Sequence, residues 1–279
     1  MASDAAIVSH FVAEVVACDL DGTLLAPDLS YAPELPPALA HLRAAGIDTV
    51  FCTGRMFVSA RKVAARLGLR QGLIVCYQGA MVLDLSSGER LLHTTMDTEL
   101  AAEVVRVARA LGRHVNAYID DRLFVEDLSD WARRYAEHVE VELNVVPNLE
   151  EAVMRRPPTK LVLLTAAADA EQLLPHLQER WQDRLYVTRS QPEYIEIADA
   201  TVSKSGALEW LCARDGLRRE RVVACGDGMN DVDMLRWAGL GIAMAEATPP
   251  VRAAGDLVVP RADLPAVFED LAATAVRLR

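Results

Sequence analysis

The sequence predicts an α/β fold, in which a core built on a parallel sheet is interrupted by an inserted α+β module. Short apolar runs alternate with helical patterns in the first third of the chain, which is typical of βαβ units. After about residue 85 the pattern changes, and turn sequences separate neighbouring strand patterns. The last third returns to the first pattern, so one core with one insertion explains why the outer segments resemble each other.

The first third is predicted to contain three strands and two helices. The strands are expected at residues 12–18, 47–52 and 73–76, and the helices at residues 36–46 and 59–67. The first helix has two prolines at its start and Gly46 just past its end, which are the positions these residues favour.

The same sequence signals predict the strands and helices of the middle and the last third of the chain. In the middle we expect strands at 81–85, 115–119, 123–125, 160–165, 185–188 and 194–197, with helices at 97–111 and 170–181. In the last third we expect helices at 205–215 and 232–237, with strands at 221–225, 241–244 and 257–259. We therefore predict a core formed by residues 1–85 and 199–279, and an inserted module of residues 86–198.

Composition limits the class of protein. The chain has 279 residues, of which 52% are hydrophobic, enough for about two domains with a sizeable core. A net charge of -11 argues against nucleic acid or an anionic membrane as a partner. No apolar run is long enough to cross a membrane, and Glu14 and His10 interrupt the first apolar stretch, so we predict no signal peptide. Five cysteines without C-x-x-C spacing favour a reducing compartment, and we predict a cytoplasmic protein.

Polar residues follow four of the predicted core strands where each strand ends. These segments are Asp19-Leu-Asp-Gly-Thr23, Thr53-Gly-Arg55, Gln78-Gly79 and Gly226-Asp-Gly-Met-Asn-Asp231. Lys204, one of only three lysines, stands just before a predicted helix. Because ligands bind at the carboxyl ends of strands in an open parallel sheet, we expect these residues to share one site.

Four carboxylates at one edge would repel one another, which raises their pKa values unless a cation lies between them. Mg²⁺ prefers oxygen ligands and accepts phosphate oxygens as well. Thr53 and Lys204 would then supply hydrogen bonds and positive charge to a phosphate. The residues therefore predict a phosphoryl-transfer site, in which an aspartate attacks phosphorus and forms an aspartyl-phosphate.

The segments DLDGT, TGR and GDGMND, with a lysine in VSKSGA at residues 202–207, together resemble the haloacid dehalogenase (HAD) superfamily. More narrowly, they resemble its Cof-type phosphatases with a large C2B cap. The resemblance covers essentially the whole chain, since the insertion falls where that cap belongs. It implies a Rossmann-like core and a Mg²⁺-dependent phosphatase that acts on small phosphorylated metabolites such as sugar phosphates.

The resemblance also implies a role for each acidic residue of the motifs. Asp19 would be the nucleophile and a metal ligand. Asp21 would protonate the leaving-group oxygen and then deprotonate the attacking water, while its main-chain carbonyl binds Mg²⁺. Asp227 would ligate the metal, and Asp231 would hold a metal-bound water.

A second set of residues would bind the phosphoryl group. The resemblance assigns this role to the side chains of Thr53 and Lys204 and to the main chain of Leu20 and Gly54. Asn230 would contact the phosphate or orient Lys204.

Three positions carry open questions. The family often has Asn-Gly where this chain has Gln78-Gly79, so a substrate contact by Gln78 does not follow. It also commonly has Gly-Asn-Ala where this chain has Ala245-Glu-Ala247, and the negative Glu246 speaks against a phosphate role for that loop. Arg55 could equally bind substrate or pair within the protein.

Two other functions stay open at this point. A phosphomutase would return the phosphoryl group from the aspartate to a sugar instead of water. A binding or regulatory module would hold a phosphate ligand without catalysis, although binding alone does not require the acid Asp21. The sequence names neither a particular substrate nor an oligomeric state.

Overall fold

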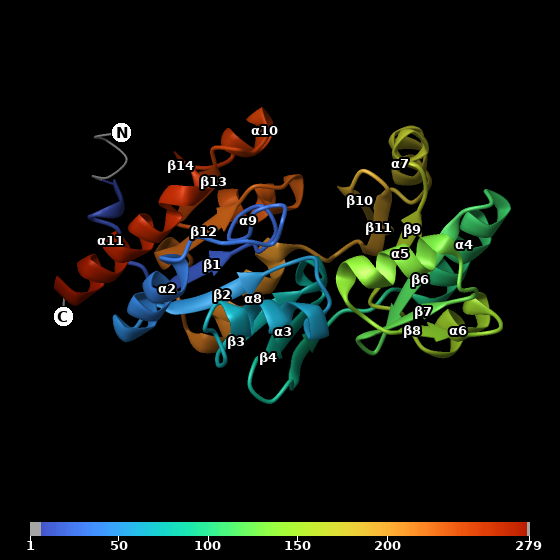
Figure 1. Cartoon of the computed structure of the whole chain (residues 1–279), viewed down its shortest axis with the longest axis horizontal. Helices are drawn as coiled ribbons and strands as arrows, with labels where there is room; N and C mark the ends of the chain where they lie inside the picture. The colour runs from blue at the N-terminus through green and yellow to red at the C-terminus, as the bar shows by residue number, and fades with distance from the viewer. Residues whose placement is uncertain (1–6, 278–279) are drawn as a thin grey trace. The chain divides into compact units, whose positions relative to one another are not determined.

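The computed structural model describes residues 7–277, and within them the chain forms two compact units. The core unit consists of residues 7–53, 60–91 and 203–277. The inserted unit consists of residues 54–59 and 92–202. Figure 1 shows the elements of both units with their labels. The predicted fold class, an α/β core with an inserted α+β module, is confirmed.

The core unit is built on an eight-stranded sheet with the order β14-β13-β12-β1-β2-β3-β4-β5. In chain order these strands are β1 (Val15–Cys18), β2 (Asp48–Cys52), β3 (Leu73–Cys76), β4 (Met81–Asp84), β5 (Arg90–His93), β12 (Val222–Gly226), β13 (Leu240–Met244) and β14 (Leu257–Val259). The pairs from β14 to β3 are parallel, whereas β4 pairs with β3 in the antiparallel direction. Parallel pairing brings the ends of β1 and β12 to the same edge.

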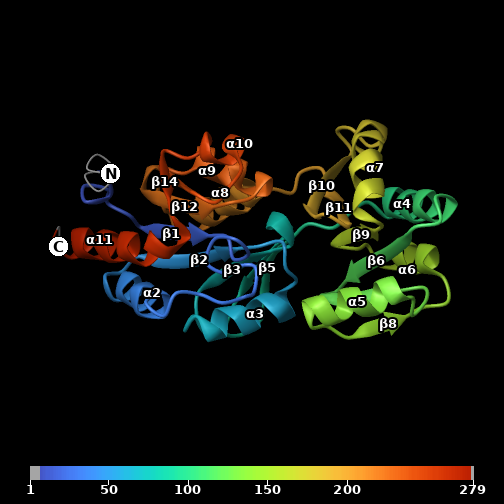
Figure 2. The ribbon, with the colours of Figure 1, turned by 45° about the horizontal axis from the view of Figure 1, so that its top comes forward.

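Helices cover both faces of the core sheet. They are α2 (Leu35–Ala44), α3 (Phe57–Arg66), α8 (Lys204–Asp215), α9 (Val232–Trp237), α10 (Pro249–Arg252) and α11 (Leu264–Arg277). Figure 2 shows α2 and α3 on one side of the sheet and α8 and α9 on the other. Because both faces are covered, β1 and β12 are buried along their whole length, which is why they read as unbroken apolar runs.

The inserted unit contains a six-stranded sheet with the order β10-β11-β9-β6-β7-β8. Its strands are β6 (His114–Ile119), β7 (Arg122–Val125), β8 (Leu143–Val145), β9 (Lys160–Leu164), β10 (Leu185–Gln191) and β11 (Tyr194–Asp199). Its helices are α4 (Thr98–Ala110), α5 (Asp130–Val139), α6 (Leu149–Arg155) and α7 (Ala167–Arg180). One buried apolar cluster joins α4, α6 and α7 to alternate strand residues such as Val115, Ala117 and Ile119.

Six helices and strands of the structure were not predicted from the sequence: β5, α5, β8, α6, α10 and α11. In α5 only Ala132, Tyr135 and Ala136 are buried, so its apolar face is narrow and made mostly of small side chains. The helix α6 has only seven residues and starts at the side chain of Asn148, which accepts a hydrogen bond from the Glu151 amide. None of the helices between residues 7 and 277 combines the length and the apolar character that a membrane crossing requires.

Candidate active site

The candidate site lies where β1 and β12 end. Cys18 pairs with Cys225 in the parallel register, and the Asp19 amide donates a hydrogen bond to the Cys225 carbonyl at 3.0 Å. Asp19 therefore stands directly beside the loop that follows Gly226, although more than two hundred residues separate the two in sequence. The expected convergence of DLDGT with GDGMND is present in the structure.

Lys204 lies between two carboxylates. Its Nζ donates to Oδ1 of Asp19 and to Oδ1 of Asp231, each at 2.6 Å. Lys204 is the first residue of α8, and the Ser203 hydroxyl caps this helix by accepting from the Gly206 amide at 3.0 Å. All three charged side chains are buried, with relative exposures of 5% for Asp19 and 1% for Lys204 and Asp231. Water screens these charges little, so their interactions are strong.

The pKa values at the site reflect burial first and the neighbouring charges second. Burial raises the pKa of Asp19 well above its ordinary value, Lys204 opposes this shift, and the neighbouring carboxylates add to it. Burial alone would lower the pKa of Lys204, but the attraction of Asp19 and Asp231 outweighs it and raises that pKa. Burial also raises the pKa of Asp227 to about 6 against a hydrogen bond from Thr23. The single ammonium of Lys204 lies among several carboxylates, so a bound cation would reduce the repulsion between them.

The donor set fits a hard divalent cation. Asp19, Asp227 and Asp231 each offer a carboxylate oxygen, and these atoms lie within 4.8 Å of one another. Asp231 already binds Lys204, and its Oδ2 accepts from the amides of Asp227 and Gly228 at 3.0 and 2.8 Å. Asp19 and Asp227 therefore present the oxygens best suited to a hard cation.

Gly22 allows the two acidic loops to approach each other. Its φ is +95°, and a Cβ built on it would lie 2.1 Å from Oδ2 of Asp227. Thr23, the next residue, donates from Oγ1 to Oδ1 of Asp227 at 2.8 Å. The glycine of DLDGT is therefore required for close packing and for its backbone conformation.

The phosphate-binding candidates of the core unit occupy the same strand ends. Thr53 is buried directly after β2, and its amide donates to the Val75 carbonyl at 2.9 Å. Leu20 is also buried, and its carbonyl closes the turn after β1 by accepting from Leu24 and Leu25. Asp21, the residue after Leu20, is exposed.

Gln78 has a clear contact in the structure. Its Oε1 accepts from Nδ2 of Asn230 at 2.9 Å, so the two residues orient each other. Gln78 has a positive φ of 60°, and the following Gly79 packs so tightly that a Cβ there would lie 2.0 Å from the Ser203 carbonyl oxygen. The loop at Gln78 thus lies against the residue that precedes Lys204.

Gly54 and Arg55 belong to the inserted unit, where both have partners. The Gly54 carbonyl accepts from Nζ of Lys160 at 3.0 Å, and Arg55 donates to the Ser59 hydroxyl at 3.2 Å. Lys160 is itself buried, and Glu196 compensates its charge at 3.1 Å.

Thr23 was not predicted as a site residue. It could have been found, because it is the last residue of the DLDGT segment.

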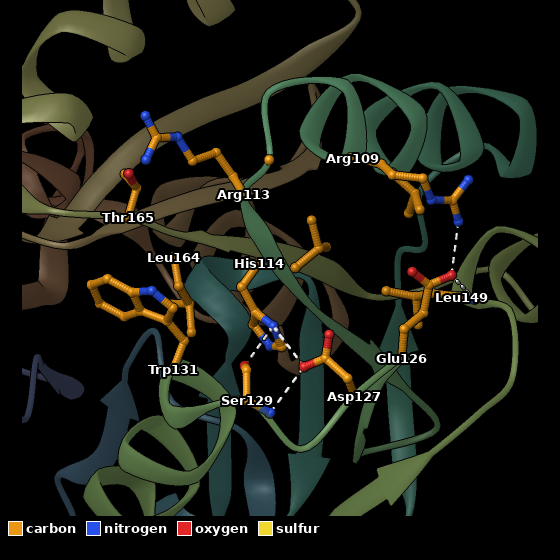
Figure 3. A pocket seen from close by; sticks show the side chains of 13 residues that line it. Arg109, Arg113, His114, Glu126, Asp127, Ser129, Trp131, Leu149, Leu164 and Thr165 are labelled. Carbon is orange, nitrogen blue, oxygen red and sulfur yellow. Dashed lines mark hydrogen bonds and ion pairs between the residues drawn. The ribbon is translucent and has the colours of Figure 1, made fainter.

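The inserted unit also contains a polar cavity of about 360 Å³, lined by residues that include Arg109, His114, Glu126, Asp127 and Ser129 (Figure 3). Its polar groups interact mainly with one another. Arg109 pairs with Glu126 at 2.7 Å, and Nδ1 of His114 lies 3.0 Å from the Ser129 hydroxyl. This cavity lacks the excess of carboxylates that distinguishes the core site.

Comparisons with known proteins agree with this geometry. The family model of the haloacid dehalogenase-like hydrolases matches residues 16–271. A crystal structure of a Thermotoga maritima protein is 33% identical, with a TM-score of 0.81, and the match covers 92% of this chain and 96% of that one.

Two relatives are named phosphatases. The pyridoxal phosphate phosphatase YbhA of Escherichia coli is 29% identical over 254 residues, which is 88% of this chain and 92% of the relative. The HMP-PP phosphatase of Serratia proteamaculans is 28% identical over 247 residues, which is 85% of this chain and 86% of the relative. The family and the phosphatase-type hydrolase predicted from the sequence are thereby confirmed, and the chain belongs to the haloacid dehalogenase-like hydrolases.

Proposed function

We propose that the protein is a Mg²⁺-dependent phosphatase that hydrolyses small phosphorylated metabolites through an aspartyl-phosphate on Asp19. The observation that carries this proposal is the shared contact of buried Lys204 with Asp19 and Asp231, with an Asp227 oxygen within 4.8 Å of theirs. A purely structural cluster would not concentrate unbalanced negative charge at a strand end that also carries two close-packed glycines.

Each residue of the core site has a task in this mechanism. The Asp19 carboxylate attacks phosphorus, and the alcohol leaves with a proton from Asp21. Asp21 then removes a proton from the water that cleaves the aspartyl-phosphate and restores Asp19. Asp231 holds Lys204 in position and fixes the Asp227 loop through two amide hydrogen bonds.

Positive charge and hydrogen bonds would stabilise the transferring phosphoryl group. Within the core unit, Lys204 supplies an ammonium, Thr53 a hydroxyl, and Leu20 its main-chain amide. Mg²⁺, held by Asp19, Asp227 and the main-chain carbonyl of Asp21, would neutralise the phosphoryl oxygens and the attacking carboxylate.

The substrate is proposed as a class. The named relatives act on HMP-PP and pyridoxal phosphate, both small phosphorylated compounds. We propose that this chain likewise acts on small phosphorylated metabolites, with sugar phosphates included. The five cysteines, all buried and without a disulfide among them, support the further proposal that it works in the cytoplasm.

A phosphate-release assay tests the proposed function. With Mg²⁺ we expect the protein to release inorganic phosphate from p-nitrophenyl phosphate and from a panel of sugar phosphates and pyridoxal phosphate. EDTA should lower the rate on the order of 10²-fold or more, because charge neutralisation at the phosphoryl group is lost.

Three other outcomes of that assay would each contradict a different part of the proposal. A rate that EDTA leaves unchanged contradicts the metal dependence. Isomerised sugar phosphate without net phosphate release would indicate a phosphomutase, and phosphate binding without any turnover a non-catalytic module.

A further inference from the structure

Arg261 contacts the catalytic loop from a distant part of the chain. Its Nε donates to the Gly22 carbonyl at 2.8 Å, across 239 positions of sequence. Arg261 is the first residue of a short 3-10 helix, Arg261–Asp263, that follows β14. This hydrogen bond therefore connects the end of the core sheet at β14 to the turn between Asp21 and Thr23.

The segment that Arg261 holds determines where Asp227 lies. The Cα of Gly22 packs against the Asp227 carboxylate, and the Thr23 hydroxyl donates to Oδ1 of the same carboxylate at 2.8 Å. A displacement of the Gly22 peptide would therefore move both contacts at once. The positive charge of Arg261 also attracts the Asp227 carboxylate.

Glu246 fixes Arg261 in turn. Its two carboxylate oxygens accept from the Arg261 amide at 3.2 and 3.3 Å. Glu246 lies in the loop after β13, and the Ala245 amide of that loop donates to the Val259 carbonyl of β14 at 2.9 Å. The carboxylate of Glu246, whose charge speaks against a phosphate role for its loop, therefore binds the main-chain amide of Arg261.

Both residues are accessible enough to be changed without opening the core. Glu246 is exposed and Arg261 is partly exposed. Together with Thr23 they line a cavity of about 340 Å³ on the core unit. Substitutions here should leave the buried sheet intact, so an effect on the site can be separated from unfolding.

We propose that Arg261, held by Glu246, is a positioning residue that keeps the Gly22–Thr23 segment in place so that Asp227 is directed at the metal. The inference rests on the proposed function, because it takes Asp227 as a magnesium ligand. It gives a task to two residues outside the recognised motifs, one of which departs from the family pattern.

Calorimetric titration with MgCl₂ alone, in the absence of substrate, tests this inference. We expect Arg261→Gln to weaken Mg²⁺ binding by about 10–100-fold, the usual effect of removing a group that orients a metal ligand. Glu246→Gln should weaken it less, and Arg261→Lys should restore part of the affinity. In turnover, the Mg²⁺ concentration for half-maximal rate should rise more than kcat falls.

Arg66→Gln is the matched control. Arg66 also donates to a main-chain carbonyl of the core unit, that of Leu29 at 3.1 Å, but it does not hold the catalytic turn. It should lower the melting temperature about as much as Arg261→Gln while leaving Mg²⁺ affinity unchanged.

Two results would overturn the inference. If wild type binds Mg²⁺ and releases phosphate while folded Arg261→Gln and Glu246→Gln bind Mg²⁺ equally well, the positioning role fails and the proposed function stands. If wild type neither binds Mg²⁺ nor releases phosphate, the proposed function fails and the inference fails with it.

Discussion

Replacing Asp19 with asparagine is expected to lower the turnover of p-nitrophenyl phosphate on the order of 10³-fold or more, because the amide cannot attack phosphorus. The fold should survive. The new side chain has the same shape, and a buried carboxylate whose pKa is raised by burial is replaced by a neutral group. Lys204 keeps Asp231 as a partner. Turnover with saturating Mg²⁺ and thermal unfolding, measured on the same sample, check this expectation.

Asp233→Asn is the matched control for that substitution. Asp233 is an aspartate of the same core unit, and its carboxylate accepts from the Ser205 hydroxyl at 2.8 Å and from the Ser205 amide at 3.2 Å. It should retain activity within a few-fold of wild type. A folded Asp19→Asn protein with more than a few per cent of wild-type turnover would remove Asp19 from its role as nucleophile.

Among the substitutions proposed for this protein, Lys204→Met should cause the largest loss of unfolding free energy. Methionine fills a similar volume but leaves Asp19 and Asp231 facing each other without a cation in a buried site. Removing one partner from a buried ion pair costs about 3–5 kcal/mol of unfolding free energy. Phosphoryl transfer should be lost as well, because the ammonium that we expect to bind the phosphate is gone.

Denaturant unfolding of Lys204→Met measures that loss. Lys62→Met serves as the control, because Lys62 is exposed, and it should change the unfolding free energy by less than about 0.5 kcal/mol. Adding Asp231→Asn to Lys204→Met should recover part of the lost stability, since one unpaired carboxylate is removed. A loss below about 1 kcal/mol for Lys204→Met would show that ion pairing does not stabilise the buried cluster of Asp19, Lys204 and Asp231.

The pattern of apolar and polar residues along the chain predicted the strands and helices whose formation depends on neighbouring residues. Apolar runs ending in Asp19 and Gly226 identified buried parallel strands, and parallel strands necessarily end at one edge. The convergence of the two acidic loops could therefore be predicted without knowing the register. The start of the helix at Lys204 was predicted to within one residue, and Ser203 is a favourable N-cap for it.

Contacts that depend on tertiary packing left no local signal. The hydrogen bond from Thr23 to Asp227 spans 204 positions, and the one from Arg261 to Gly22 spans 239. Nothing in the sequence around Arg261 distinguishes it from the many other arginines of the chain. The helix α5 was not predicted either, because its buried residues are two alanines and one tyrosine among many charged side chains.

The proposed chemistry makes Asp19 a transient carrier of the phosphoryl group, and this can be measured directly. Wild type mixed with p-nitrophenyl phosphate and Mg²⁺, quenched in acid within one turnover and digested, should yield a phosphorylated peptide whose modified residue is Asp19. The same peptide should be unmodified in Asp19→Asn. A phosphoryl group found by mass spectrometry on any other residue of the active protein would contradict the account.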